Sequence, residues 1–341
     1  DPIREELVMS LTTYLGAQGN LLSEAPEHAR MLKLATPILT CEDMARIRAA
    51  KQPEFRHSTI STVFPAASGE SGLEEALERI QDQAEKAAVD GYSILILSDR
   101  EVNVQNAPIP SLLASAAVNR RLTQTGLRTR VSIIIESGEP REVMHFALLL
   151  GYGATAVSPY LAYEVIAVQL EEGHFAVGLS IQDAVENYIH AIEKGLLKIF
   201  SKMGISTLRS YRGAQIFEAL GLSKVFIDKY FTLTPSRIGG LDVMDVARET
   251  LTRHHNAYGP RRIGSSVLDS GGDYALRRDG RRHMWTPEAI GSLQRAVREN
   301  NPDYYRKYAA SINDQMGRHC TLRGLFDFKT GTPIPLEEVE P

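Results

Sequence analysis

Cysteine is scarce in this sequence, and so are the motifs that carry catalysis or metal binding. Cys41 and Cys320 are the only cysteines among 341 residues, which excludes a disulfide framework, and no CxxC spacing is present for zinc or an iron–sulfur cluster. No HExxH, GxSxG, Walker A or GxGxxG motif occurs. We therefore expect a reduced compartment, the cytoplasm, and no metal or cofactor bound by this chain.

An excess of charge of one sign is also absent. The 38 basic and 42 acidic side chains nearly cancel to −4, so the chain lacks the electrostatic footprint of a nucleic-acid or anionic-lipid partner. A Gly- and Arg-rich stretch could bind phosphate, but it has no interleaved aromatic residues. We expect instead that it is a solvated loop or that it binds an acidic protein partner. Its arginines are Arg261, Arg262, Arg277, Arg278, Arg281 and Arg282.

A long hydrophobic run is present but interrupted. Residues 143–163 contain no Asp, Glu, Lys or Arg, and 21 such residues are enough to span a bilayer. Gly151-Tyr152-Gly153 and Ser158-Pro159 divide the run, which therefore predicts helix, turn, strand and helix rather than a membrane span.

The length and composition allow a large folded core. With 43% hydrophobic residues, 341 residues suit two domains, or one barrel-sized α/β unit with an extension. The chain starts without Met and without a signal-like segment, and it ends in PIPLEEVEP. We expect it to be a piece of a longer protein.

Strand and helix patterns alternate through the middle of the chain. Apolar β-rich runs are expected to be strands, and runs with a helical apolar stripe are expected to be helices. The predicted strands are 59–64, 92–97, 130–135 and 154–157, and the predicted helices are 73–89, 111–125, 141–150 and one starting near Pro159. Four βα units with continuous apolar strands predict a parallel sheet covered on both faces, barrel-like or doubly wound, with closure left open.

The flanking regions are expected to be mainly helical. Residues 1–57 predict short helices and ordered loop, including a helix that is capped by Thr40, with Asp43 at its third position. A long helix is predicted over 180–203 with Gly204 as its stop, then helices broken by Gly213, Gly221 and a 235–240 loop, and a further helix near Pro287. The expected domains are a 1–57 segment, a 58–258 α/β domain, and a 259–341 loop and helical segment.

The candidate chemical groups each have a simpler structural explanation. His254 and His255 are adjacent, whereas two helical metal ligands need a spacing of three or four, so packing or surface roles are expected. Gly151 and Gly153 could approach a phosphate, but a structural turn is favoured. Cys41 lies near a helix start, yet no His–Asn constellation surrounds it. The residues alone indicate a fold and no reaction.

Several long stretches resemble the central domain of the large subunit of glutamate synthase. They include residues 1–34, then IESGEPREVMHFALLLGYGATAVSPYLAYE from Ile135, KGLLKIFSKMGISTLRSYRGAQIFEALGL from Lys194, and YFTLTPSRIGGL from Tyr230, and the tail from Gly271 fits as well. Leu233 stands where this family usually has Gly. The resemblance runs over nearly the whole chain.

The resemblance implies an incomplete TIM-barrel-like α/β fold and a non-catalytic, structural role. The family makes two glutamates from glutamine and 2-oxoglutarate, with a glutaminase domain before the central domain and an FMN-binding domain with a 3Fe–4S cluster after it. Electrons come from NADPH through a small subunit or from ferredoxin, and ammonia passes through an internal tunnel. FMN and the cluster are therefore expected elsewhere in the full-length enzyme.

We hypothesise that two polar loops face the FMN-binding domain, because they interrupt otherwise apolar helices. Their residues are Ser201, Lys202, Met203, Gly204, Tyr211, Arg212 and Gly213. Ordinary helix-end roles are the competing interpretation. Two other functions stay open, namely a self-contained flavin- or phosphate-binding barrel enzyme, and an adaptor that uses the Arg-rich loop.

Overall fold

The computed structural model describes residues 5–20, 22–175, 178–259, 275–277, 280–314 and 321–339. The chain divides into two compact units, residues 1–261 and 262–341. The first unit carries the sheet and most of the helices, and the second carries a helical hairpin.

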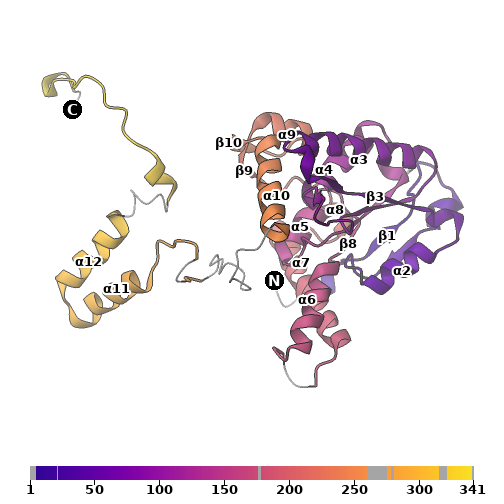
Figure 1. The fold of residues 1–341 in the computed structure, drawn as a ribbon, viewed down its shortest axis with the longest axis horizontal. Coiled ribbons are helices and arrows are strands. Elements are labelled where there is room, and N and C mark those ends of the chain that lie inside the picture. The colour runs from indigo at the N-terminus through magenta and orange to yellow at the C-terminus, as the bar shows by residue number, and fades with distance from the viewer. Residues whose placement is uncertain are drawn as a thin grey trace. The chain divides into compact units, whose positions relative to one another are not determined.

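A four-stranded parallel sheet lies at the centre of the first unit (Figure 1). Its strands run in chain order: β3 (His57–Ser61), β5 (Ile94–Ser98), β7 (Ser132–Glu136) and β8 (Ala156–Ser158). Consecutive parallel strands with a helix after each one are the arrangement of half a (βα)8 barrel. The predicted α/β fold with an incomplete barrel-like core is therefore confirmed.

A helix follows each strand, and the first three of these helices cover one face of the sheet. In chain order, the helices after the strands are α3 (Ser71–Val89), α4 (Ser111–Gln124), α5 (Val143–Gly151) and α6 (Tyr160–Glu171). The side chains of Leu95 and Leu97 belong to the core on the α3–α4 side, whereas Ile94 and Ile96 belong to a second core on the opposite side. The period-two alternation of a strand produces this division, and burial on both faces explains why the strands read as unbroken apolar runs.

The second face of the sheet is covered by the N-terminal region. β1 (Thr13–Leu15) and β2 (Leu32–Leu34) pair antiparallel, and α2 (Cys41–Ala49) contributes Met44 and Ile47 to the second core. Backbone bonds from Leu39 to Val157 and from Val157 to Pro37 also occupy the outer edge of β8. This region thus fills the side of the sheet that would face the lumen of a closed barrel.

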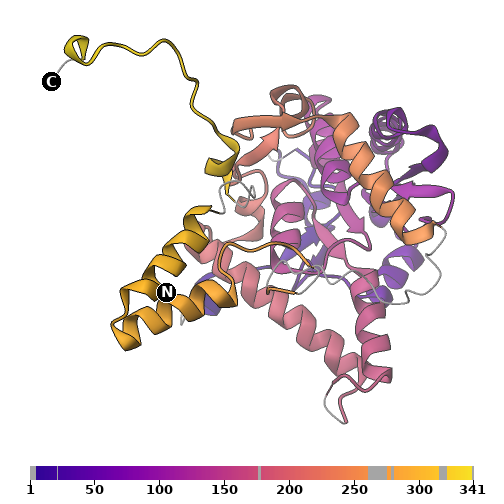
Figure 2. The same ribbon diagram turned by 60° about the vertical axis from the view of Figure 1, so that its left-hand side comes forward.

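The remaining elements extend the first unit and form the second. They are α1 (Glu5–Val8), β4 (Val63–Pro65), β6 (Asn106–Pro108), α7 (Ile181–Met203), α8 (Leu208–Tyr211), β9 (Ala219–Leu222), α9 (Lys224–Tyr230), β10 (Ser236–Leu241), α10 (Val243–Tyr258), α11 (Pro287–Glu299) and α12 (Pro302–Asn313). Short 3-10 helices lie at Pro26–Ala29, Pro53–Phe55, Ala66–Ser68, Arg128–Arg130, Leu322–Leu325 and Leu336–Glu338. In Figures 1 and 2, α6 and the first turns of α7 extend away from the sheet.

Local signals predicted several elements correctly. Thr40 caps α2 in a capping box with Asp43, and Gly204 ends α7 in the left-handed conformation with φ +69°. The uncharged run over 143–163 forms α5, β8 and the start of α6, as predicted. Within the described residues, no helix is long and apolar enough to cross a membrane.

Three predictions of local structure were wrong. Residues 59–64 form the end of β3 and the start of β4 instead of one strand, and β4 pairs antiparallel with β6. The β1–β2 hairpin was missed within 1–57, because three-residue strands carry little periodicity. The predicted 235–240 loop is mostly β10, which pairs parallel with β9, and its Gly239 and Gly240 disfavour a strand on propensity alone.

Candidate functional site

The carboxyl ends of the parallel strands carry a polar network. Ligands of open α/β sheets and of barrels bind at this edge, so its side chains are the first candidates for chemistry. Ser98 ends β5 and is followed by Asp99, and Glu136 ends β7 and is followed by Ser137. All four side chains are buried.

Glu136 is the centre of this network. Its fully buried carboxylate accepts hydrogen bonds from both terminal nitrogens of Arg48, at 3.1 and 2.7 Å, from Nε of Arg100 at 2.9 Å, and from the hydroxyl of Ser98 at 2.6 Å. Burial by itself raises the pKa of Glu136, but the hydrogen bonds from Arg48, Ser98 and Arg100 lower it overall. The carboxylate is therefore held ionised with its acceptor positions filled, which leaves it unsuited to act as a general base.

Asp99 forms the second part of the network. Its carboxylate accepts hydrogen bonds from the Ser137 hydroxyl at 2.5 Å, the Gly138 amide at 3.1 Å and the Tyr160 hydroxyl at 2.8 Å. Burial raises the pKa of Asp99, and the three donors oppose this shift. The ring of Tyr160 also lies 4.0 Å from the Arg100 guanidinium, so the two halves of the network meet at Arg100.

The network connects distant parts of the chain. Arg48 lies on α2 and Glu136 on β7, so their bidentate ion pair ties α2 to the strand ends. Cys41, the first residue of α2, is exposed and its Sγ lies 3.6 Å from Nη2 of Arg100. These contacts fix the covering helix against the sheet, which is a structural function.

The same edge does not fit the phosphate of a flavin. A phosphate needs free cationic or amide donors, but here Arg48 and Arg100 are paired with Glu136, and Asp99 adds a second carboxylate nearby. Among the described residues, no group of three or more His, Cys, Asp or Glu has the geometry of a metal site. The structure thus gives no support to a flavin or phosphate site at the strand ends.

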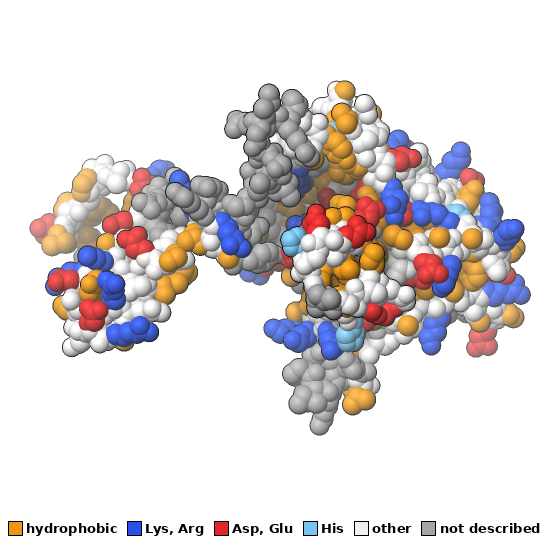
Figure 3. Space-filling view, turned by 60° about the horizontal axis from the view of Figure 1, so that its bottom comes forward, with side chains coloured by type: hydrophobic (Ala, Val, Ile, Leu, Met, Phe, Trp, Pro, Cys, Tyr) orange, Lys and Arg blue, Asp and Glu red, His pale blue; other side chains and the backbone are white. Residues whose placement is uncertain are grey.

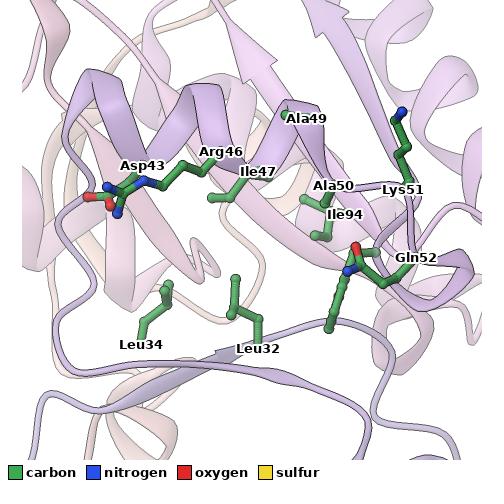
Figure 4. Close-up of a pocket in the computed structure, with 11 residues that line it drawn as sticks. Leu32, Leu34, Asp43, Arg46, Ile47, Ala49, Ala50, Lys51, Gln52 and Ile94 are labelled. Atoms are coloured by element: carbon green, nitrogen blue, oxygen red, sulfur yellow. The ribbon is translucent and has the colours of Figure 1, made fainter.

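A hollow lies between α2 and β2 (Figure 4). It has a volume of about 700 Å³, and Leu32 and Leu34 of β2 face Ile47 and Ile94 across it. Two of the polar groups on its wall have partners nearby, since Asp43 caps α2 with Thr40 and Arg46 pairs with Glu42. The hollow is mainly apolar and lacks a set of convergent polar groups for catalysis.

The residues of the predicted interface have different environments. Lys202, Met203 and Gly204 lie exposed at the end of α7, and Gly213 is also exposed. Tyr211 is fully buried, stacks on Phe200 and donates to the carbonyl of Ala147 at 3.2 Å. The Tyr211 side chain therefore belongs to the core and offers no surface to a neighbouring domain. Ser201 and Arg212 are half-buried.

The other sequence candidates have structural roles. His254 is buried, with Nε2 2.7 Å from the carbonyl of Asn103. Gly153 has φ +109° in the turn after α5, and a Cβ there would meet Asn119 at 2.4 Å, so this glycine serves the turn. Arg261, Arg262, Arg278 and Cys320 lie outside the described residues. On the face in Figure 3, basic and acidic side chains are interspersed.

Sequence reasoning missed the Glu136 network. A signal was present, because Asp99 directly follows one apolar strand and Glu136 ends the next, and parallel strands bring their carboxyl ends together. The sequence around Arg48, the partner of Glu136, gave no indication that the two side chains would pair.

Comparison with known proteins identifies the family. The model of the glutamate synthase central domain matches residues 1–223. The whole chain is 43% identical to the glutamate synthase [NADPH] large chain of Bacillus subtilis, 42% to the glutamate synthase [NADH] of Schizosaccharomyces pombe, and 37% to the ferredoxin-dependent glutamate synthase of Pyropia yezoensis. It covers 22%, 16% and 22% of these proteins, about a fifth of their length.

Solved structures give a weaker match. A mutant flavocytochrome b2 with benzoylformate aligns over 51% of this chain and 37% of its own, at 15% identity and a TM-score of 0.35. The family model covers well over half of the chain, and the long relatives match it from end to end. This chain belongs to the glutamate synthase central-domain family.

Proposed function

We propose that this chain is a non-catalytic structural domain within a glutamate synthase large subunit, linking the glutaminase and FMN-binding domains. In this role it helps to enclose the route of ammonia between the reaction that splits glutamine and the reaction that converts 2-oxoglutarate to glutamate. FMN and the 3Fe–4S cluster belong to other parts of the enzyme. The electron donor is NADPH through a small subunit, or ferredoxin, and the compartment is the cytoplasm.

The observation that carries the proposal is an exposed apolar face on α6. Leu161, Val165 and Val168 recur at spacings of four and three, so they share one side of the helix, and each is 43–51% exposed. Tyr163 is the only buried residue of α6. An apolar face of this kind is typical of a surface that packs against another part of a protein.

The length of the relatives supports the proposal that another domain of the same polypeptide covers this face. The chain spans about a fifth of their length, so most of each polypeptide lies outside the region matched here. A neighbouring domain of the same polypeptide is already held at high effective concentration, and a modest apolar face is enough to dock it. We assign the exposed α6 face to such a docking contact, with Lys202, Met203, Gly204 and Gly213 as a second contact toward the FMN-binding domain.

The interior of the domain is suited to a rigid spacer. Both faces of the sheet bury apolar side chains, and the Arg48–Glu136 ion pair fixes α2 across the strand ends. Ammonia that escapes into water becomes protonated and diluted. A rigid wall between two sites therefore raises the local concentration of ammonia at the second site.

The test is a substitution on the α6 face in a complete glutamate synthase that carries this domain. Val165→Glu places a charge on the proposed docking contact, and burying an unpaired charge weakens such contacts by tenfold or more. We expect glutamine hydrolysis and ammonia-dependent glutamate formation to persist. Glutamine-dependent glutamate formation should fall by about tenfold, with ammonia released to the solvent. Lys202→Glu tests the second contact by the same assays.

Val89→Glu is the matched control. Val89 is 65% exposed at the end of α3, away from both proposed contacts, and its substitution should leave every rate unchanged. Normal glutamine-dependent rates in both Val165→Glu and Lys202→Glu would contradict the proposal. A folded Val165→Glu enzyme, shown by an unchanged melting temperature, is required for the comparison.

A further inference from the structure

A small polar pocket lies at the amino-terminal edge of the sheet, away from the Glu136 network. It has a volume of about 250 Å³ and is formed by the chain around β1 and the start of α8. Its lining residues are Ser10, Thr12, Thr13, Tyr14, Gln18, Met31, Thr207, Arg209 and Arg212. The lining contains two arginines and several hydroxyl groups but no carboxylate.

The arginines of this pocket have neutral hydrogen-bond partners within the described residues. Among the described residues, no carboxylate pairs with Arg209, Arg212 or the neighbouring Arg128. Their hydrogen-bond acceptors are uncharged: Arg209 donates to the side chain of Gln18 at 3.2 Å, and Arg212 donates to the hydroxyl of Thr155 at 3.3 Å.

Arg128 makes the excess of charge larger. It donates to the Asn119 side chain at 2.6 Å and to the Gly153 carbonyl at 2.7 Å, both of which are neutral. Burial and the nearby charge of Arg212 lower the pKa of Arg128 to about 10. Burial and the charge of Arg209 likewise lower the pKa of Arg212. The guanidinium group of Arg212 is therefore repelled by those of Arg128 and Arg209, and both Arg128 and Arg212 are largely removed from water.

We propose that this pocket binds a small oxyanion, a carboxylate or phosphate group of a small molecule. Guanidinium groups match the planar or tetrahedral oxygens of such anions. A bound anion offsets the repulsion between Arg209 and Arg212. This proposal does not depend on the scaffold function, since it concerns binding alone.

The experiment measures binding to the 341-residue chain by calorimetry and by the shift in melting temperature. The probes are inorganic phosphate and succinate, each compared with chloride at equal ionic strength. We expect saturable binding of phosphate, succinate or both, and a melting temperature that rises with the free anion. The ranking of the two probes shows whether a phosphate or a carboxylate is the preferred group.

One variant and one control locate the site. Arg209→Gln should weaken the affinity by about ten- to a hundredfold, the effect of losing a charged hydrogen bond. Arg237→Gln is the control, because Arg237 is 82% exposed and pairs with Glu218.

Either of two results would overturn the proposal. The first is equal effects of phosphate, succinate and chloride, which would indicate ionic strength alone. The second is wild-type affinity in Arg209→Gln, which would place the binding elsewhere. Arg209 is exposed, so this variant stays informative even where a change at the half-buried Arg212 prevents folding.

Discussion

Glu136 is a buried carboxylate held by two arginines. Its carboxylate is fully buried and receives charged hydrogen bonds from Arg48 and Arg100, whose side chains are 35% and 39% exposed. Breaking a buried ion pair is costly because the remaining charge loses its partner. Here the arginines can still reach water, which places the expected cost toward the lower end of the usual range.

We predict that Glu136→Gln lowers the free energy of unfolding by about 2–3 kcal/mol at pH 7. The folded-state pKa of Glu136 is depressed, so its contribution is fully present above the ordinary value of 4.5 and is lost as pH falls below it. Urea denaturation at pH 7 and pH 4 should therefore show a smaller difference between wild type and variant at the lower pH.

Glu42→Gln provides the comparison for this prediction. Glu42 pairs with Arg46 on the exposed surface of α2, where such pairs contribute about 0–1 kcal/mol. If Glu136→Gln costs no more than Glu42→Gln, the Glu136 network does not hold α2 to the sheet.

At the level of elements, α7 has well-defined ends. The Ser180 hydroxyl accepts from the amide of Asp183, and Gly204 closes the helix with φ +69°. A different solution occurs at Leu233, which adopts φ +69° with a branched side chain. The backbone at this position accordingly favours glycine.

Two glycine substitutions should have opposite effects on stability. Gly204→Ala introduces a side chain in the left-handed region, where nothing else lies within 4 Å of the added Cβ, so only strain contributes. We expect a loss of about 1 kcal/mol. Gly291→Ala lies inside α11, also in open space but with ordinary helical backbone, and should gain about 0.5–1 kcal/mol.

Thermal unfolding followed by circular dichroism measures both glycine effects. Because residues 1–261 and 262–341 are separate compact units, the Gly204 and Gly291 effects are expected to add in the double variant. A stabilised Gly204→Ala chain would show that the left-handed end of α7 is not needed.

For the whole molecule, the proposal of a non-catalytic domain has a direct consequence. The carboxyl ends of the strands carry paired charges that do not suit a flavin phosphate. The face of the sheet that would line the lumen of a barrel is covered by α2 and the β1–β2 hairpin. The strands and helices follow one another as in half a (βα)8 barrel. The carboxyl ends of the strands, where barrel enzymes carry their active sites, hold internal ion pairs in this domain.

We predict that the purified 341-residue chain is colourless and does not form glutamate from glutamine or ammonia with 2-oxoglutarate. An absorbance scan across the flavin bands and a glutamate assay check this expectation. Flavin absorbance that persists through gel filtration would favour the alternative barrel enzyme. A complex with an acidic protein that weakens strongly with salt would instead favour the adaptor function.

The amino-acid sequence by itself determined the elements whose signals are local. The apolar stripe of α3, the Thr40 cap, the Gly204 stop and the breaks within residues 143–163 each act over a few residues. Helical periodicity and capping require no distant partner, and for that reason these features could be predicted. The family could also be predicted from the sequence, because the motifs that carry the resemblance are long continuous stretches.

Only the tertiary structure decided which residues meet across the chain. The Arg48–Glu136 pair joins residues 88 positions apart. β9 and β10 pair although they contain three glycines. Tyr211 turns into the core from the end of α8, where the sequence predicted a polar loop. The excess of positive charge at Arg209 and Arg212 also arises from packing. Long-range contacts of this kind depend on which surfaces remain to be buried after the local elements form, and no short pattern records that choice.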